Sequence, residues 1–278
     1  MGFSWNGAPQ QAMAGRLFVI HTYNSLLIKL LAAEIVSAHG LTTTMQPAQA
    51  MAALLDDSAM LDLLNQDIEH GGIFEQAGIR GFVEEAIFSW YLDVAHDVSH
   101  SSPMITSLRG VMASLSMYRT DYMTHTRDVL RDLYQGLVPG RLRQSLGEFY
   151  TPDWLVDFTV DNAKHGSWLG KRVLDPTCGS GAFLVALIRR IRDEAIKAKW
   201  SSDKIVRHLC TSVWGFDLNP LAVQTARVNF LMELAELLKI SPGQELEIPV
   251  LLADAIYSPA PDPEIGQDVV KYQIGSQV

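Results

Sequence analysis

The chain has few residues of the kinds that build metal centres and disulfide frameworks. Its 278 residues include two cysteines, Cys178 and Cys210, which lack the paired spacing of a zinc site. The same small number excludes a disulfide scaffold. We therefore expect no metal site, and we expect both thiols to be buried or inert.

Long hydrophobic runs are also missing. The most apolar stretch, Leu26–Val36, contains Lys29 and Glu34 and is too short and too charged to span a bilayer. It predicts a buried helix instead. The first residues lack the basic start and compact apolar run of a secretory signal peptide. We therefore expect a cytoplasmic globular protein with no membrane partner.

Positive charge is scarce. The formal net charge is −9, whereas neutralising nucleic-acid phosphates requires Lys and Arg. Residues 1–100 carry three basic against eleven acidic side chains, but residues 101–148 carry six arginines against four acids. These six are candidate phosphate contacts: Arg109, Arg119, Arg127, Arg131, Arg141 and Arg143. An equally open alternative is a solvated helix face on which they pair with Asp121, Asp128 and Asp132.

The first half of the chain has the periodicity of helices. Apolar residues recur at intervals of three and four and predict helices over Leu17–His39, Ala52–Leu64, Phe82–Val94 and Ile105–Leu137. Gly40 is expected to end the first of them. We predict an all-helical N-terminal domain over residues 1–145.

The most informative segment is Asp175-Pro176-Thr177-Cys178-Gly179-Ser180-Gly181-Ala182-Phe183, a glycine-rich turn. Arg172–Leu174 predict a buried strand before it, and Ala182–Ile191 predict a helix after it. The glycines allow a tight turn and a close approach of the backbone to a ligand. The spacing is not GxGxxG, and no Gly-Lys-Ser/Thr follows, so pyrophosphate and P-loop sites are disfavoured. An acid at the end of the strand favours a cationic or amino-bearing ligand.

Two more apolar segments end in acids. Ser212–Phe216 run into Asp217, and Ile248–Leu252 precede Asp254. Ligands of open α/β sheets bind outside the carboxyl ends of the strands, so we expect all three acids at one sheet edge. There Asp217 is placed to accept hydrogen bonds from ribose hydroxyls, Leu218 to cover a purine face, and Asp254 to accept from an adenine amine. The alternative for Asp217 is a helix-start signal before Asn219 and Pro220.

In its motifs and their order the chain resembles the S-adenosylmethionine-dependent adenine-N6 DNA methyltransferases of restriction-modification systems. The segment Gly147-Glu148-Phe149-Tyr150-Thr151-Pro152 is similar to the family motif that packs over the methionine end of the cofactor. The resemblance covers Leu146 to Ile256. It implies an α/β fold with a Rossmann-like methyltransferase core over residues 146–278, incomplete at its C-terminal end.

The resemblance also implies which residues bind S-adenosylmethionine. Thr151 and its neighbours would contact the methionine carboxylate, and Asp175 with the turn that follows would hold the amino acid moiety. Asp217 would take the ribose, Asp254 the adenine amine, and Phe183 a wall of the pocket. The full implied set is Glu148, Phe149, Tyr150, Thr151, Pro152, Asp175, Pro176, Thr177, Cys178, Gly179, Ser180, Gly181, Phe183, Asp217, Leu218 and Asp254.

One departure from the family matters. Its catalytic tetrapeptide, Asn/Asp-Pro-Pro-aromatic, is absent, because no two prolines of the chain are adjacent. In the family this tetrapeptide binds the target amine and stacks on the flipped base. We therefore expect no catalytic residue here. The expected function is the cofactor-binding part of a DNA adenine-N6 methyltransferase, inactive alone, with DNA and a DNA-specificity domain or subunit as partners.

Two alternatives stay open. The chain fits a methyltransferase with a protein or RNA acceptor, whose cofactor motifs would look similar. It also fits a non-catalytic module that binds S-adenosylmethionine or assembles with a specificity subunit.

Overall fold

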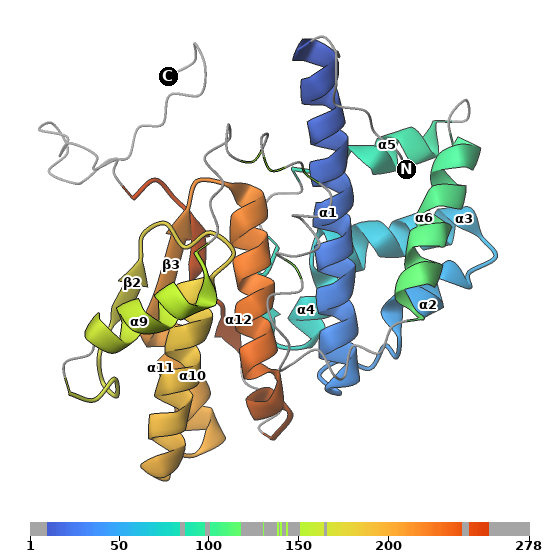
Figure 1. Cartoon of the computed structure of the whole chain (residues 1–278). Coiled ribbons are helices and arrows are strands. Elements are labelled where there is room, and N and C mark those ends of the chain that lie inside the picture. The colour runs from blue at the N-terminus through green and yellow to red at the C-terminus, as the bar shows by residue number, and fades with distance from the viewer. Residues whose placement is uncertain are drawn as a thin grey trace, which may run out of the picture.

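A computed structural model describes residues 10–83, 87–97, 101–117, 130, 138, 140, 143, 151–163, 166–240 and 245–255. Figure 1 shows two groups of elements that pack side by side. The first is helical and comprises α1 Gln10–Ala38, α2 Pro47–Ala52, α3 Asp57–Leu63, the π-helix η1 Leu64–Glu69, α4 Gly72–Gln76, α5 Trp90–His96 and α6 Ser101–Leu115.

The long helix α1 is the buried helix that the sequence predicts. Leu30, Ala32 and Ile35 are fully buried, and α1 ends at Ala38, before Gly40 with its positive φ of 68°. By length and composition alone, residues Ala14–Ala38 would be apolar enough to cross a membrane, but 78% of the most apolar window is buried inside the protein. Apolar residues on all sides are typical of such a core helix.

Three predicted helices have wrong boundaries. The helix expected over Ile105–Leu137 corresponds to α6, which begins at Ser101 and ends at Leu115. The chain breaks after α2, and α3 begins at Asp57, because the carboxylate of Asp56 accepts a hydrogen bond from the Ser58 amide at 2.9 Å and caps a new helix. The helix expected from Phe82 begins only at Trp90. Phe82 instead follows Gly81, whose φ is +60°, and its carbonyl accepts a hydrogen bond from Arg227 at 3.1 Å.

The second group alternates helices and strands. It comprises α9 Asp153–Ala163, β2 Val173–Asp175, α10 Ala182–Lys197, α11 Ser202–Ser212, β3 Val213–Asp217, α12 Pro220–Ile240, β4 Leu246–Glu247 and β5 Val250–Leu252. A parallel sheet has the order β2-β3-β5, with Asp175 opposite Gly215 and Asp217 opposite Leu252. The three predicted strands are confirmed to within two residues, but the expectation that the first is buried is wrong, because Leu174 in β2 is 49% exposed at this edge strand.

A short strand departs from the all-helical expectation for the first half. β1, Ile79–Arg80, pairs in parallel with β4, so that Ile79 lies opposite Leu246. Two residues between Gly78 and Gly81 are too few for an alternating pattern. The sequence gives no local sign of this pairing.

Helix α12 lies at the centre of the molecule. Figure 1 shows it between α1 on one side and the sheet with α10 on the other. Phe230, Leu231, Leu234 and Ala235 are fully buried, and the buried hydrophobic residues of both halves belong to one continuous core. The two halves therefore meet through a shared core, and the division at residue 145 remains a prediction.

Candidate functional site

The ends of the three parallel strands form one edge of the sheet. Asp175 is the last residue of β2, Asp217 is the last residue of β3, and Asp254 follows β5 by two residues. Because the strands are parallel and adjacent, the structure brings these acids to the same edge, as the sequence predicts. The glycine turn between β2 and α10 crosses this edge.

Backbone bonds hold the glycine turn against β3. The Cys178 amide donates to the Phe216 carbonyl at 2.8 Å, and the Gly181 amide donates to the Cys178 carbonyl at 2.8 Å. Gly179 and Gly181 have φ of +53° and +89°, where side chains are strained. The turn is thus a fixed structure with its own hydrogen bonds.

The two glycines face different surroundings. A Cβ atom on Gly181 would lie 3.2 Å from the Cβ of Ala226, so this glycine allows α12 to pack closely. A Cβ atom on Gly179 would have nothing within 4 Å. The turn is therefore closed toward α12 and open at Gly179.

Asp217 connects the turn to the start of α12. Its Oδ2 accepts a hydrogen bond from the Gly179 amide at 2.9 Å, and its Oδ1 accepts one from the Asn219 amide at 2.8 Å. Asn219 in turn accepts from the Leu221 amide at 3.0 Å, with Pro220 in the first position of the helix. The helix-start interpretation is confirmed, and each Asp217 oxygen retains acceptor capacity.

Asp175 differs from Asp217, because one of its oxygens has no partner. Oδ1 accepts a hydrogen bond from the Thr177 amide at 3.2 Å, whereas Oδ2 is buried and has no hydrogen-bond partner among the residues that the structure describes. Burial raises the pKa of Asp175; the Thr177 hydrogen bond opposes this shift, and the charge of Asp217 adds to it. Buried polar groups are nearly always satisfied, so an orphaned carboxylate oxygen needs an explanation.

With this geometry in place, similarity to known proteins becomes informative. Residues 125–257 match the family model described as N-6 DNA Methylase. The resemblance predicted from the motifs is thereby confirmed.

Three relatives share parts of the chain. The adenine-specific methyltransferase PglX of Streptomyces coelicolor is 31% identical over 134 residues, which are 45% of this chain and 11% of that protein. The type I restriction enzyme EcoEI methylase subunit of Escherichia coli is 29% identical over 118 residues (42% and 22%). The MjaIX methylase subunit of Methanocaldococcus jannaschii is 33% identical over 92 residues (32% and 14%). The chain thus matches between 11% and 22% of the length of these relatives.

Among solved structures, the cryoEM structure of a DrdV–DNA complex aligns with 90% of this chain and 26% of its own chain. The sequence identity is 16%, and the TM-score is 0.37. A likeness this weak carries no argument about fold or function.

The remaining predicted site residues have varied exposure. Thr151 and Phe183 are half-buried, and Pro152, Pro176 and Thr177 are exposed. The Leu218 side chain is 68% exposed, and Asp254 is exposed beside it at the same edge, whereas Ser180 is buried. Glu148, Phe149 and Tyr150 lie outside the described residues.

Both cysteines are free thiols; the predicted burial is confirmed for Cys178, whereas Cys210 is half-buried. Burial raises the pKa of Cys178 to about 12, with the charges of Asp175 and Asp217 adding to the shift, and burial alone raises the pKa of Cys210 to about 12. Cys178 also packs against β3, because a Cβ atom on Gly215 would lie 3.1 Å from its Sγ. The sequence reasoning missed Gly215, although a glycine inside a strand is a sign of close approach.

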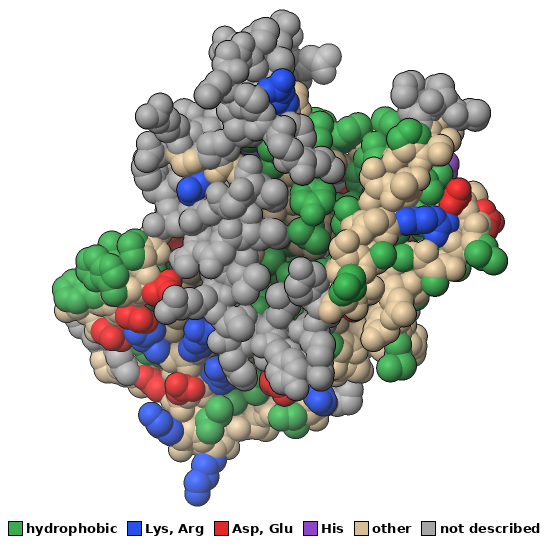
Figure 2. All heavy atoms as spheres, turned by 45° about the vertical axis from the view of Figure 1, so that its right-hand side comes forward, with side chains coloured by type: hydrophobic (Ala, Val, Ile, Leu, Met, Phe, Trp, Pro, Cys, Tyr) green, Lys and Arg blue, Asp and Glu red, His purple; other side chains and the backbone are tan. Residues whose placement is uncertain are grey.

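Only two of the six candidate phosphate-binding arginines are described, and both have partners. Arg109 donates to the Ala52 carbonyl at 2.7 Å and to Asp57 at 2.5 Å. Arg143 donates to the Val138 carbonyl at 3.2 Å. Figure 2 shows acidic and basic side chains intermingled on the face in view. Arg109 thus pairs with Asp57 of α3 and not with one of the acids that the sequence suggested; those acids and the other four arginines lie outside the described residues.

One pair of histidines has a spacing that occurs in metal sites, although the sequence analysis predicts no metal site. His96 and His100 stand four residues apart, a spacing that places two ligands on one helix face. However, α5 ends at His96, and residue 100 lies outside the described part of the chain. Within the described ranges, no group of three or more His, Cys, Asp or Glu is arranged to hold a metal ion.

Proposed function

We propose that this chain supplies the S-adenosylmethionine-binding part of a DNA adenine-N6 methyltransferase. The observation that carries the proposal is Oδ2 of Asp175, which is buried with no hydrogen-bond partner in the described part of the chain and precedes a turn that is open at Gly179. An ammonium group of a ligand would satisfy this oxygen, and a glycine with free space allows a ligand to approach the backbone closely. The match of residues 125–257 to the N-6 DNA methylases supports the same conclusion.

The fold supports this assignment. Three parallel strands with their acids at one edge, covered by α10 and α12, are consistent with the Rossmann-like core of a methyltransferase. In this proposal residues 146–278 form that core, and residues 1–145 form a mainly helical N-terminal domain.

Each residue at the edge has a task that its chemistry suits. Asp175 binds the amino group, and pairing with this cation lowers its raised pKa and removes the cost of the orphaned oxygen. The first turn of α10, entered through Gly181, presents unpaired backbone amides to the carboxylate. Asp217 orients the ribose through its remaining acceptor capacity. Leu218 offers an exposed apolar surface to the adenine ring, and Asp254 an acceptor to its amine.

Bound S-adenosylmethionine supplies an electrophilic methyl group, so the protein mainly has to align donor and acceptor. The groups that bind the acceptor amine are missing, because no two prolines of the chain are adjacent. We therefore infer that the chain does not transfer the methyl group alone and that another polypeptide segment provides the catalytic tetrapeptide. Two relatives are named as type I restriction enzyme methylase subunits, so we also propose DNA and a specificity domain or subunit as partners.

The test is a calorimetric titration of the purified chain with S-adenosylmethionine. We expect saturable binding that Asp175→Asn weakens by about tenfold or more, because a hydrogen bond to a charged group contributes roughly 1.5–3 kcal/mol. Asp203→Asn, an exposed substitution in the first turn of α11, is the matched control and should bind as the wild type does. No binding by the folded wild-type chain would refute the proposal.

The missing tetrapeptide also favours a second candidate, a non-catalytic module that binds S-adenosylmethionine. Methylation assays on unmodified DNA distinguish the two. A partner polypeptide that restores transfer supports the methyltransferase, whereas binding that no partner converts into transfer supports the module.

A further inference from the structure

Helix α12 contacts the glycine turn directly. Ala226 packs against Gly181, where an added Cβ atom would be 3.2 Å away, and Asn229 donates from Nδ2 to the Ser180 carbonyl at 2.9 Å. Asn229 and Ser180 are both buried. Any shift or rotation of α12 therefore moves the surface on which the turn rests.

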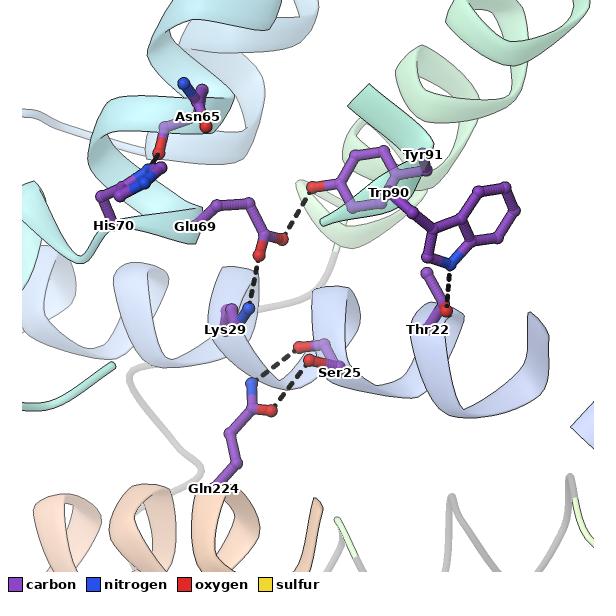
Figure 3. Close-up of polar contacts among 9 residues, drawn as sticks. All are labelled: Thr22, Ser25, Lys29, Asn65, Glu69, His70, Trp90, Tyr91 and Gln224. Carbon is purple, nitrogen blue, oxygen red and sulfur yellow. Dashed lines mark hydrogen bonds and ion pairs between the residues drawn. The ribbon is translucent and has the colours of Figure 1, made fainter. Parts of the chain in front are cut away.

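The other side of α12 is joined to α1 by a reciprocal pair of hydrogen bonds (Figure 3). Ser25 Oγ donates to Gln224 Oε1 at 2.8 Å, and Gln224 Nε2 donates to the Ser25 carbonyl at 2.9 Å. Ser25 is 1% exposed. One side chain on α12 is thus bound to both the hydroxyl and the backbone of one residue on α1.

We propose that Gln224 is a positioning residue for the S-adenosylmethionine site, and that α1 fixes the glycine turn through it. This inference rests on the function proposed above. Gln224 lies two residues before Ala226 and five before Asn229, which is about 3 and 7.5 Å along the helix axis. It also lies in the second turn after Pro220, close to the Asp217–Asn219 connection. The same helical segment therefore carries the contact with α1 and the contacts with the site.

The polar pair adds directionality to contacts that are mostly apolar. Both α1 and α12 are buried on most sides, and hydrophobic burial is non-directional, so it resists sliding or rotation of one helix on another only through shape. Two partly buried hydrogen bonds with fixed geometry favour one position, because in any other position they are lost and the buried groups of Ser25 are left unsatisfied. Gln224 thereby selects the rotation of α12 that places Ala226 and Asn229 against the turn.

Helix α1 is itself fixed to the rest of the helical group, so it can serve as the reference. Lys29 Nζ lies 2.5 Å from Glu69 Oε2, and the Tyr91 hydroxyl donates to Glu69 Oε1 at 2.7 Å. Trp90 Nε1 donates to Thr22 Oγ1 at 2.8 Å. Figure 3 shows these bonds on the opposite side of α1 from Gln224. A chain of contacts thus runs from η1 and α5 through α1 and α12 to the glycine turn.

The test uses the full chain with three variants. Gln224→Met removes both hydrogen bonds at nearly constant volume, and Ser25→Ala removes only the hydroxyl. The control is Glu236→Ala, which removes another contact between the same helices, the 3.3 Å pair with His39 Nε2, and lies 12 residues farther along α12. For each variant we would measure the dissociation constant for S-adenosylmethionine, the thermal midpoint, and the hydrogen exchange of the Cys178 and Gly179 amides without ligand.

We expect Gln224→Met to weaken S-adenosylmethionine binding about fivefold and Ser25→Ala about twofold, in the range of couplings carried through packed elements. Both variants should speed exchange of the Gly179 amide, whereas Glu236→Ala should change neither quantity. The inference is overturned if Gln224→Met exchanges and binds as the wild type does, or if Glu236→Ala has equal effects at an equal thermal midpoint. If the wild type binds no S-adenosylmethionine, the proposed function fails, and exchange of the Gly179 amide alone decides the role of Gln224.

Discussion

Two carboxylates with buried oxygens, Glu69 in the helical group and Asp175 at the sheet edge, have opposite surroundings. Both oxygens of Glu69 have partners, Lys29 at 2.5 Å and Tyr91 at 2.7 Å. Burial and the charge of Glu69 raise the pKa of Tyr91 well above its ordinary value, so the phenol remains a donor. One oxygen of Asp175 accepts a hydrogen bond from a backbone amide, and the other has no hydrogen-bond partner within the described ranges.

The difference separates a structural group from a binding group. A buried charge whose acceptors are all used is complete without a ligand, and it contributes to the fold. A buried acceptor left free destabilises the protein alone and is compensated when a donor binds. The comparison therefore supports the proposed ligand site at the sheet edge and assigns the Glu69 cluster to the stability of α1.

The largest expected effect comes from breaking the Glu69 cluster. Lys29→Met should lower the free energy of unfolding by about 3–5 kcal/mol, because it leaves a buried carboxylate without its counter-charge. Urea denaturation measures this. The double variant Lys29→Met/Glu69→Leu should recover part of the loss, and no recovery would mean that packing, not charge, causes the effect.

Asp217→Ala should have the next largest effect, about 2–3 kcal/mol on the free energy of unfolding. The Asp217 carboxylate accepts from two backbone amides, Gly179 and Asn219, and hydrogen bonds to charged groups are the stronger kind. Asp217→Asn keeps one acceptor oxygen and should lose less. Equal losses in urea denaturation would show that these two hydrogen bonds do not hold the turn.

The two glycines should separate stability from binding at the same turn. Gly181→Ala combines a positive φ with a contact to Ala226 and should destabilise the fold by about 2 kcal/mol, whereas Gly179→Ala meets only the backbone strain of about 1 kcal/mol. Gly179→Ala should nevertheless weaken S-adenosylmethionine binding more than Gly181→Ala does, because its side is open. Parallel losses of stability and affinity in the two variants would contradict this assignment.

The smallest effect concerns pH. Because the pKa of Asp175 is raised in the folded protein, the folded state binds more protons than the unfolded chain between the ordinary aspartate pKa and the raised value. The free energy of unfolding therefore falls as pH rises through this window. Asp175→Asn does not titrate, so its stability relative to the wild type should increase across the window and level off above it. Urea denaturation at a series of pH values measures the difference. Parallel curves of unfolding free energy against pH for the two proteins would mean that the pKa of Asp175 is not raised in the folded state.

Much of the site was predictable because its signals are local. Each strand of the central sheet ends within a residue or two of a predicted acid, and the glycine turn follows from residues that tolerate positive φ. The helix boundaries at Asp57 and Trp90 were missed because a capping side chain and a long-range hydrogen bond to Phe82 outweighed the apolar period.

The sequence alone determined the acid-terminated strands, the glycine turn and the burial of α1, since each depends on neighbouring residues. Only the tertiary structure decided that Ser25 contacts Gln224, 199 residues away, and that β1 pairs with β4. It also decided that one oxygen of Asp175 has no hydrogen-bond partner among the described residues, whereas both oxygens of Glu69 have one. These outcomes depend on how whole elements are placed relative to one another. Contacts between distant residues leave no periodic pattern along the chain, and so no local rule predicts them.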